Sequence, residues 1–307
     1  MGLASGHGGG EAIDLGAPVV DDLLGRCSFG AAGEVACAVS GGADSSALLV
    51  LAVAHGHRVT AVHVDHGLRA GSGAEAEIVA DLARRLGCGF RAERVAVADG
   101  PNLEARAREA RRSVLPPDAL TGHTADDRAE TVLLHLLRGA GPDGLTGIAR
   151  GPRRPLLDLR RADTERLCAD LGLAVVIDPT NRDRRFRRNR LRHEVLPLLA
   201  DVADRDVVPL LVAAGDRAAA FADLLDDLAA EVDPTDARAV ADLPHPVAAT
   251  ALRRWLVREG VGGGYGIDAD TVDRVLAVAR GDAVACEVTG GHRVARTANR
   301  LRLDPPS

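Results

Sequence analysis

The sequence contains no lysine: all 38 basic side chains among its 307 residues are arginine. This absence excludes a Walker-type phosphate loop, because that loop needs a lysine to contact the β and γ phosphates of a nucleotide. Aromatic side chains make up only 2% of the chain, so stacking platforms for single-stranded nucleic acid are scarce. Any contact with RNA is therefore expected to be electrostatic or based on shape.

Cysteine pairs and long apolar runs are also missing. The five cysteines form no C-x-x-C pair, which argues against a zinc ribbon or a disulfide framework; they are Cys27, Cys37, Cys88, Cys168 and Cys286. No apolar run reaches the ~20 residues that span a bilayer, and residues 1–16 are glycine-rich without a basic region. We therefore predict a cytoplasmic protein without membrane contact and with a disordered segment at 1–16.

Apolar runs alternate with helical periodicity along the first half of the chain. Strands are expected at residues 35–39, 58–65, 90–97 and 119–122, and helices at 45–54, 75–86, 103–114 and 126–137. Such repeated β-α units predict an α/β fold with a doubly wound, Rossmann-like parallel sheet. In these sheets a ligand lies beyond the carboxyl ends of the strands, where three turns of this chain carry distinctive motifs.

The later part of the chain has a different pattern. Helical periodicity covers residues 207–230, 246–258 and 268–280, and short alternating segments at 284–303 predict a small terminal sheet. Because a domain usually has ~100–200 residues, the length allows two domains. We predict a nucleotide-binding domain at 17–200, a linker near 201–206 and a smaller, mainly helical domain at 207–307.

The first motif, S-G-G-A-D-S at residues 40–45, ends a predicted strand and opens a helix. Gly41 and Gly42 let the backbone approach an anion. The helix that begins near Ala43 directs its unpaired N–H groups at the same anion. Ser40 and Ser45 add hydroxyl groups, and the Asp44 carboxylate is suited to share a Mg²⁺ ion with phosphates. The predicted ligand is a nucleotide polyphosphate; the alternative is an ordinary glycine-rich turn.

The spacing of this motif narrows the type of phosphate loop. It does not supply the G-x-G-x-x-G of a dinucleotide fingerprint, and a Walker loop is excluded by the missing lysine. The remaining pattern, S-G-G-x-D-S, resembles the pyrophosphate loop of ATP pyrophosphatases. Those enzymes cleave ATP to AMP and pyrophosphate while they adenylate a substrate.

The second and third motifs follow other predicted strands. Alternation places His63 and Asp65 on one side of a strand and His66 in the next loop, which favours a polar nucleotide pocket over a metal cluster. In the third motif His123 precedes a helix on which Asp127 and Glu130 share a face. A helix start explains one acid but not the pair, so we favour a pocket for a cationic substrate over a capping role.

A basic run stands out against the net charge of -6. Seven arginines are interrupted by only one acid, Asp183, within residues 182–192; they are Arg182, Arg184, Arg185, Arg187, Arg188, Arg190 and Arg192. Guanidinium groups suit phosphate, and such a cluster of like charges is repulsive unless it finds phosphate. We predict a phosphate-backbone contact, with a solvated helical face as the alternative.

Together these motifs resemble the tRNA(Ile)-lysidine synthetase family, over residues 35–200 and more weakly over 243–303. Further matching motifs are L-L-R-G-A-G at 136–141, R-P-L-L at 154–157, D-P-T-N at 178–181 and R-N-R-L-R-H at 188–193. Arg128 and Arg112 depart from the family pattern, which usually has Gln and Tyr there. The resemblance implies an adenine nucleotide α-hydrolase-like fold and a homodimer.

The resemblance also implies a two-step ligation that uses ATP and Mg²⁺. The O2 of the wobble cytidine in tRNA(Ile) with a CAU anticodon attacks the α-phosphate of ATP, and the ε-amine of free lysine then displaces AMP. In this interpretation Asp44 binds the metal, His63 and residues 40–45 contact ATP, and His123 lies near the reacting centre. Asp127 and Glu130 bind lysine, and tRNA is held by Arg184, Arg185, Arg187, Arg188, Arg190 and Arg192.

Two other functions remain open at this point. Another pyrophosphate-loop enzyme, such as a tRNA thiolase or an amidotransferase-type synthetase, would share the first crevice. A thiolase that carries a cluster would need paired cysteines, which this chain lacks. A non-catalytic nucleotide sensor on the same fold would bind ATP without turnover.

Overall fold

A computed structural model describes residues 12–65, 72–95, 112–262 and 267–306, together with Arg106 and Ala110. The chain forms two compact units. Unit 1 comprises Met1–Ala140 and Gly144–Gly215, and unit 2 comprises Gly141–Asp143 and Asp216–Ser307. The segment predicted at 1–16, His66 and most of the helix predicted at 103–114 fall wholly or largely outside the described residues.

Unit 1 is built on a four-stranded sheet with the order β3-β2-β1-β4. The strands are β1 (Glu34–Ala38), β2 (Arg58–Asp65), β3 (Gly89–Arg94) and β4 (Leu120–Thr121), and every neighbouring pair is parallel. The predicted parallel α/β fold is confirmed. The chain moves outward from β1 to β3 and then returns to the other side of β1. The carboxyl ends of β1 and β4 therefore flank the switch point, where such sheets bind ligands.

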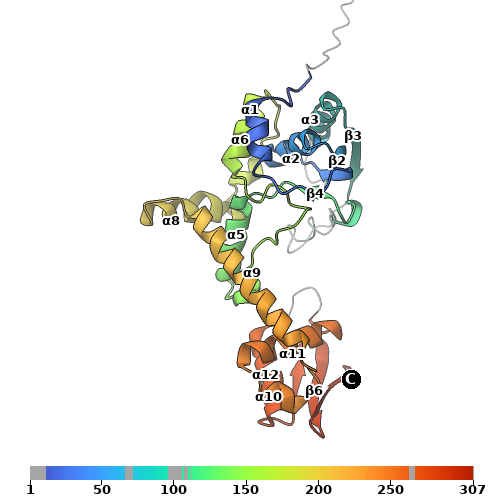
Figure 1. Cartoon of the computed structure of the whole chain (residues 1–307), viewed down its shortest axis with the longest axis vertical. Coiled ribbons are helices and arrows are strands. Elements are labelled where there is room, and N and C mark those ends of the chain that lie inside the picture. The colour runs from blue at the N-terminus through green and yellow to red at the C-terminus, as the bar shows by residue number, and fades with distance from the viewer. Residues whose placement is uncertain are drawn as a thin grey trace, which may run out of the picture. The chain divides into compact units, whose positions relative to one another are not determined.

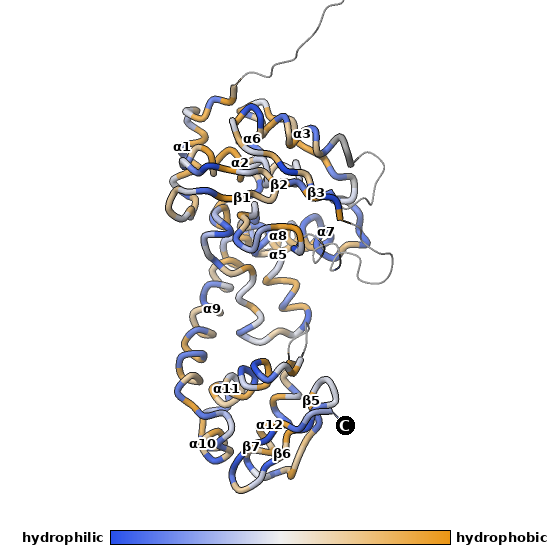
Figure 2. Tube along the Cα trace, turned by 90° about the vertical axis from the view of Figure 1, so that its right-hand side faces the viewer, coloured by the Kyte–Doolittle hydropathy of each residue, from blue (hydrophilic) through white to orange (hydrophobic). Residues whose placement is uncertain are grey.

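The helix that follows β1 is the centre of the unit 1 core. In α2 (Ala43–Ala54) eight consecutive residues, 45–52, are buried, as expected for a helix that is apolar on all sides. It packs against α1 (Pro18–Leu24) and α6 (Arg161–Asp170), which lie beside it in Figure 1, and its tube is mostly hydrophobic in Figure 2. Helix α3 (Ser72–Arg85) packs on β2 and β3. This packing fixes the start of α2 at the switch point.

The elements after β4 bring distant segments toward the same edge. Helix α5 (Ala125–Leu136) shares a second apolar cluster with the segment after residue 190, through Ala129, Leu133, Leu191 and Leu196. That segment contains the 3-10 turn η2 (Pro179–Arg182), α7 (Arg187–Arg190), the π-helical turn η3 (Leu191–Val195) and α8 (Leu196–Val202). A further 3-10 turn, η1, covers Pro142–Gly144. The basic run is thereby anchored to α5.

Unit 2 is helical with a small sheet, as the periodicity predicted. The division between the units falls after Gly215, within helix α9 (Val208–Ala230). The linker was predicted near 201–206, but these residues form the end of α8 and a turn. Unit 2 continues with α10 (Ala237–Ala241), α11 (His245–Arg258), α12 (Ala269–Arg280), β5 (Ala285–Val288), η5 (Thr289–Gly291), β6 (His292–Thr297) and β7 (Arg300–Asp304).

The three strands of unit 2 are antiparallel in the order β5-β6-β7. Their inner face packs on the helices around Trp255, Leu256, Leu276 and Val294, all of which are at most 3% exposed. Among the described residues, none of the helices combines the length and the apolar character needed to cross a membrane.

Candidate functional site

The loop between β1 and α2 is shaped by glycine and closed by a serine. Gly41 has a φ of 88°, and a Cβ there would lie 2.7 Å from Cγ2 of Val176, so a larger residue is excluded on two grounds. The Ser45 hydroxyl donates to the Gly42 carbonyl (2.9 Å) and accepts from the Ser40 N–H (3.2 Å). Gly42 caps α2 without a side-chain hydrogen bond. The first N–H groups of α2 are thus left for an anion.

The turn after β4 lies directly against this loop. A Cβ on Gly122 would be 2.6 Å from the Asp44 carbonyl oxygen, so only glycine permits the approach. The next residue, His123, has its Nδ1 2.9 Å from Oγ1 of Thr121. Two motifs that are 80 residues apart are therefore in contact, as the topology predicted.

A cavity of about 1010 Å³ opens over these two turns. Of the predicted site residues, it is lined by Ser40, Gly42, Ala43, Asp44, Ser45, His123 and Arg192. Its other walls are Arg161 and Glu165 of α6, the apolar segment 175–177, and Asp178, Asn181 and His193. Sequence reasoning gave these walls no role, although Asp178, Asn181 and His193 lie in motifs that carried the family resemblance.

His63 occupies a different place from the one expected. It is 2% exposed, its Nδ1 lies 2.9 Å from the Val39 carbonyl oxygen, and it is absent from the described residues that line the cavity. This hydrogen bond holds the end of β1 next to β2. Among the described residues no group of three or more His, Cys, Asp or Glu side chains is arranged to hold a metal ion.

Asp44 is the acid of the phosphate loop, and its surroundings are partly desolvated. Burial raises the pKa of this carboxyl to about 6, although a hydrogen bond from Thr164 and the charge of Arg161 act in the opposite direction. The Arg161 Nε lies 3.5 Å from Oδ2 of Asp44. Thr164 and Arg161 of α6 therefore favour the ionised form of Asp44, against the effect of burial.

The two acids of α5 have distinct surroundings. Asp127 forms a capping box, because its Oδ2 accepts hydrogen bonds from the Thr124 N–H (2.9 Å) and hydroxyl (3.2 Å). The capping role that was the alternative thus exists for one acid. Glu130 has no such role and is completely buried. A buried carboxylate needs a cation, so the pair still requires positive charge beside it.

Arginines of this chain supply that positive charge. Arg161 lies 2.8 Å from Oδ1 of Asp127 and 3.4 Å from Oε1 of Glu130. Arg192 lies 2.7 Å from Glu130 through its Nε and 3.6 Å from Asp127. Arg188 adds a third contact, 3.7 Å from Oε2 of Glu130. Neither acid is among the described residues that line the cavity, whereas Arg161 and Arg192, which contact both acids, are.

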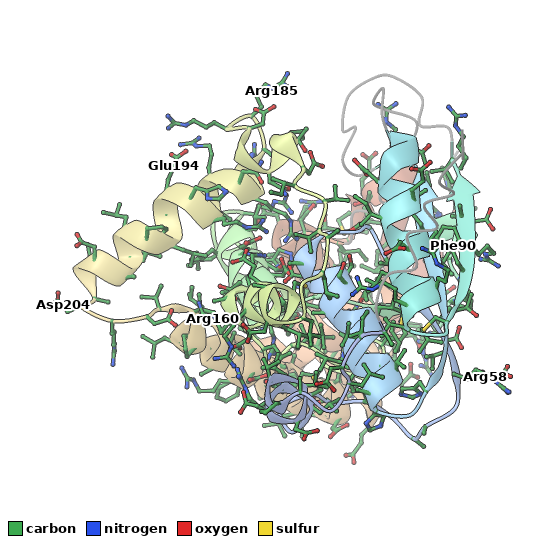
Figure 3. All side chains as sticks on the ribbon, turned by 90° about the horizontal axis from the view of Figure 1, so that it is seen from above. Arg58, Phe90, Arg160, Arg185, Glu194 and Asp204 are labelled. Atoms are coloured by element: carbon green, nitrogen blue, oxygen red, sulfur yellow. The ribbon has the colours of Figure 1, made fainter. Side chains whose placement is uncertain are left out.

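The basic run is divided between the interior and the surface. Arg188 and Arg192 turn toward Glu130, Arg184 and Arg190 pair with Glu194, and Arg185 pairs with Asp183. The argument that these arginines repel unless they find phosphate was wrong, since most of them pair with carboxylates of the same unit. Arg185 is nonetheless 86% exposed, and Figure 3 shows it at the periphery with its side chain pointing outward.

Of the two departures from the family pattern, Arg128 is almost completely buried, at 1% exposed, within α5. Its Cγ would lie 3.4 Å from a Cβ placed on Gly147. Arg112 is exposed. Neither is among the described residues that line the cavity.

Comparison with known families agrees with the geometry of unit 1. Residues 21–199 match the PP-loop domain family, ATP_bind_3. This match, with the parallel sheet and the phosphate loop at its switch point, defines an ATP-binding PP-loop protein.

Relatives cover nearly the whole chain. A tRNA(Ile)-lysidine synthase of Nocardia farcinica is 43% identical over 294 residues, which is 89% of this chain and 92% of that protein. One from Rhodococcus erythropolis is 42% identical, covering 74% and 75%, and one from Rhodococcus jostii is 40% identical, covering 88% of each. The chain belongs to the tRNA(Ile)-lysidine synthase family.

A solved structure gives a more distant likeness. The U34-tRNA thiolase NcsA from Methanococcus maripaludis, with its [4Fe-4S] cluster, matches with a TM-score of 0.49 and 16% identity. The match covers 65% of this chain and 76% of that one. The family assignment does not depend on it.

Proposed function

We propose that this protein is an ATP-dependent ligase that forms lysidine at the wobble cytidine of a tRNA(Ile) with a CAU anticodon. The observation that carries the proposal is the arrangement of one cavity. The anion-binding start of α2 lies on its wall, and the half-buried Asp127 and the completely buried Glu130 are in contact with Arg161 and Arg192, which also line it. An activating nucleotide and a cationic amine thus have adjacent places.

ATP binds with its β and γ phosphates at residues 40–45. Backbone N–H groups of the loop and the positive end of α2 stabilise the charge of the departing pyrophosphate, which replaces the function of a P-loop lysine. Asp44 faces the cavity and fits a Mg²⁺ ion shared with phosphates, because such an ion usually takes only one or two carboxylates. When bound, the ion would neutralise phosphate charge.

The first step activates the cytosine. Its O2 attacks the α-phosphate of ATP, the new P–O bond forms, and pyrophosphate leaves. An amide-like oxygen is a poor leaving group until it is phosphorylated, so this step makes C2 open to substitution. His123 lines the cavity beside the phosphate loop and is placed near this reacting centre.

The second step uses lysine. The ε-amine forms a bond to C2, the bond between C2 and the adenylate oxygen breaks, AMP departs, and the new nitrogen loses its extra protons. Asp127 and Glu130 recognise the positive charges of free lysine, for which a buried carboxylate beside a half-buried one is suited. Exposed arginines near residues 184–190 contact the tRNA backbone.

Transfer of label from lysine to RNA tests the proposal. The purified protein is incubated with ATP, Mg²⁺, radiolabelled lysine and a CAU-anticodon transcript, with a transcript carrying another anticodon as control. We expect label only in the first RNA, together with AMP and pyrophosphate. AMP release without lysine incorporation would indicate another pyrophosphate-loop enzyme, and ATP binding without turnover would indicate a sensor. The resemblance also suggests a cytoplasmic location and a homodimer. Light scattering on the same preparation measures the oligomeric state.

A further inference from the structure

Three carboxylates and three guanidinium groups form one charge cluster beside the cavity. The acids are Asp44, Asp127 and Glu130, and the bases are Arg161, Arg188 and Arg192. Formal charges in the cluster cancel. Any ligand that brings charge to the cavity must therefore disturb this balance or be compensated by rearrangement of the cluster.

The three arginines of the cluster differ in the residues that they contact. Arg161 alone contacts both the phosphate loop, through Asp44, and the acids of α5. Arg192 contacts both α5 acids and also lines the cavity. Arg188 contacts Glu130 and the Thr131 hydroxyl but is not among the described residues that line the cavity. Two of the three are thus positioned to face an incoming phosphate.

We infer that Arg161 and Arg192 act as an exchangeable cover: they occupy the α5 acids in the nucleotide-free enzyme, and the phosphates of ATP draw them away, which opens those acids to lysine. The inference rests on the proposed function and adds to it a coupling between the two substrates. Nucleotide binding then strengthens lysine binding. By linkage, lysine strengthens nucleotide binding by the same factor.

Charge and geometry both favour the exchange. A guanidinium fork binds phosphate as well as carboxylate, so moving Arg161 from one anion to another preserves its ion pairing. Of the acids that it leaves, Glu130 is completely buried and Asp127 is half-buried. An unpaired buried carboxylate is costly, so the lysine ammonium takes the vacated place. The main chain need not move, because the Arg161 N–H is anchored to Oδ2 of Asp126 at 2.8 Å.

Titration calorimetry tests the coupling without catalysis. Lysine is titrated into the full chain with and without a saturating mixture of Mg²⁺ and α,β-methylene-ATP, which cannot be cleaved at the reacting bond. We expect the lysine Kd to fall about tenfold or more with the analogue, equivalent to about 1.4 kcal/mol. The reverse titration, analogue into enzyme with and without lysine, is expected to give the same factor.

Variants of adjacent arginines identify the cover. Arg161→Met keeps the length of the side chain without its charge, so lysine is expected to bind the nucleotide-free variant more tightly and the coupling factor is expected to shrink. Arg160→Met is the matched control: Arg160 pairs with Asp126 and Asp206 and is not among the described lining residues, so it is expected to keep the wild-type factor. Arg161→Lys keeps the charge and serves if the Met variant does not fold; it is expected to retain part of the coupling.

The outcomes separate this inference from the proposed function. A lysine Kd that is the same with and without the analogue in the wild-type protein would overturn the inference that Arg161 and Arg192 act as a cover. So would a wild-type coupling factor in both Arg161 variants. If the analogue does not bind at all, the proposed function fails first. Lysidine formation with no coupling would leave the function intact and remove only the inference.

Discussion

Gly122 lies against the backbone of Asp44, so closely that a Cβ at position 122 would be 2.6 Å from the Asp44 carbonyl oxygen. This contact joins the turn after β4 to the first turn of α2. It places His123 beside the phosphate loop, and it makes the geometry of one motif depend on the size of a residue in another.

Replacement of Gly122 by alanine is expected to disturb the phosphate loop. The added Cβ meets backbone atoms that cannot rotate away, and such overpacking costs about 1–3 kcal/mol. We expect a lower melting temperature and at least about tenfold weaker binding of a non-hydrolysable ATP analogue, measured by calorimetry. Gly33→Ala is the control, because no atom lies within 4 Å of its added Cβ. Analogue binding by Gly122→Ala at wild-type strength would contradict this prediction.

Replacement of Glu130 by glutamine is expected to raise the lysine KM more than the ATP KM. The variant removes a completely buried carboxylate that pairs with Arg192, and breaking a buried pair costs about 3–5 kcal/mol. The melting temperature should fall as well. Glu165→Gln, which changes an exposed acid of the cavity wall, is expected to alter neither quantity much. Steady-state kinetics with lysine varied measure the effect. An unchanged lysine KM for Glu130→Gln would show that Glu130 does not bind lysine.

The exposed part of the basic run is expected to bind tRNA, whereas the inward part is expected to act on lysine. A combined Ala variant at Arg184, Arg185, Arg187 and Arg190 should weaken tRNA binding and leave the lysine KM nearly unchanged. Each lost phosphate contact should lower the slope of log K against log salt by about 0.7–0.9.

Filter binding of tRNA at several salt concentrations measures this slope. Arg58→Ala is the control, since Arg58 is 81% exposed at the amino end of β2 and well apart from Arg185 in Figure 3. An unchanged slope in the combined variant would show that these arginines do not contact the tRNA and form a solvated surface instead.

Stability is expected to fall at alkaline pH because of buried thiols. Burial raises the pKa of Cys27, Cys37 and Cys168 to about 12, from 9.0 in a solvent-exposed chain. Between these values the unfolded chain loses thiol protons that the folded chain keeps, so each thiol lowers the unfolding free energy by about 1.4 kcal/mol per pH unit.

Urea unfolding at pH 8, 10 and 11 measures the slope. Cys168→Ala is expected to reduce it by the contribution of one thiol, whatever its effect on stability at pH 8. A slope that is the same in the variant and the wild-type protein would show that this thiol ionises equally in both states.

The strands and the phosphate loop were predictable because their signals are local. Strands of a parallel sheet are covered on both faces, so β1 is apolar from Val35 to Ala38 and β2 is buried at Val59 and at residues 61–63. Gly41 and Gly42 mark a turn, and at Gly41 there is no room for a Cβ. The helix predicted from residue 126 begins at Ala125, because Thr124 and Asp127 form a capping box that the spacing contains.

The roles of charged side chains were less accessible. Arg161 has no motif around it that sets it apart from Arg160, yet one faces the cavity and the other pairs with Asp126. The basic run looked uniform in sequence, but a helical turn directs Arg188 and Arg192 inward while Arg185 stays at the surface. His63 lies on the predicted strand but is not among the described residues that line the cavity.

The order of residues by itself determined the repeated β-α units, the lysine-free phosphate loop and the family to which the chain belongs, because backbone conformation and apolar periodicity depend on neighbours in sequence. Only the tertiary structure decided which carboxylates meet which guanidinium groups. The pairs around Asp127 and Glu130 join residues more than 30 positions apart, and the burial of Glu130 makes its pairing obligatory once the fold has brought these residues together.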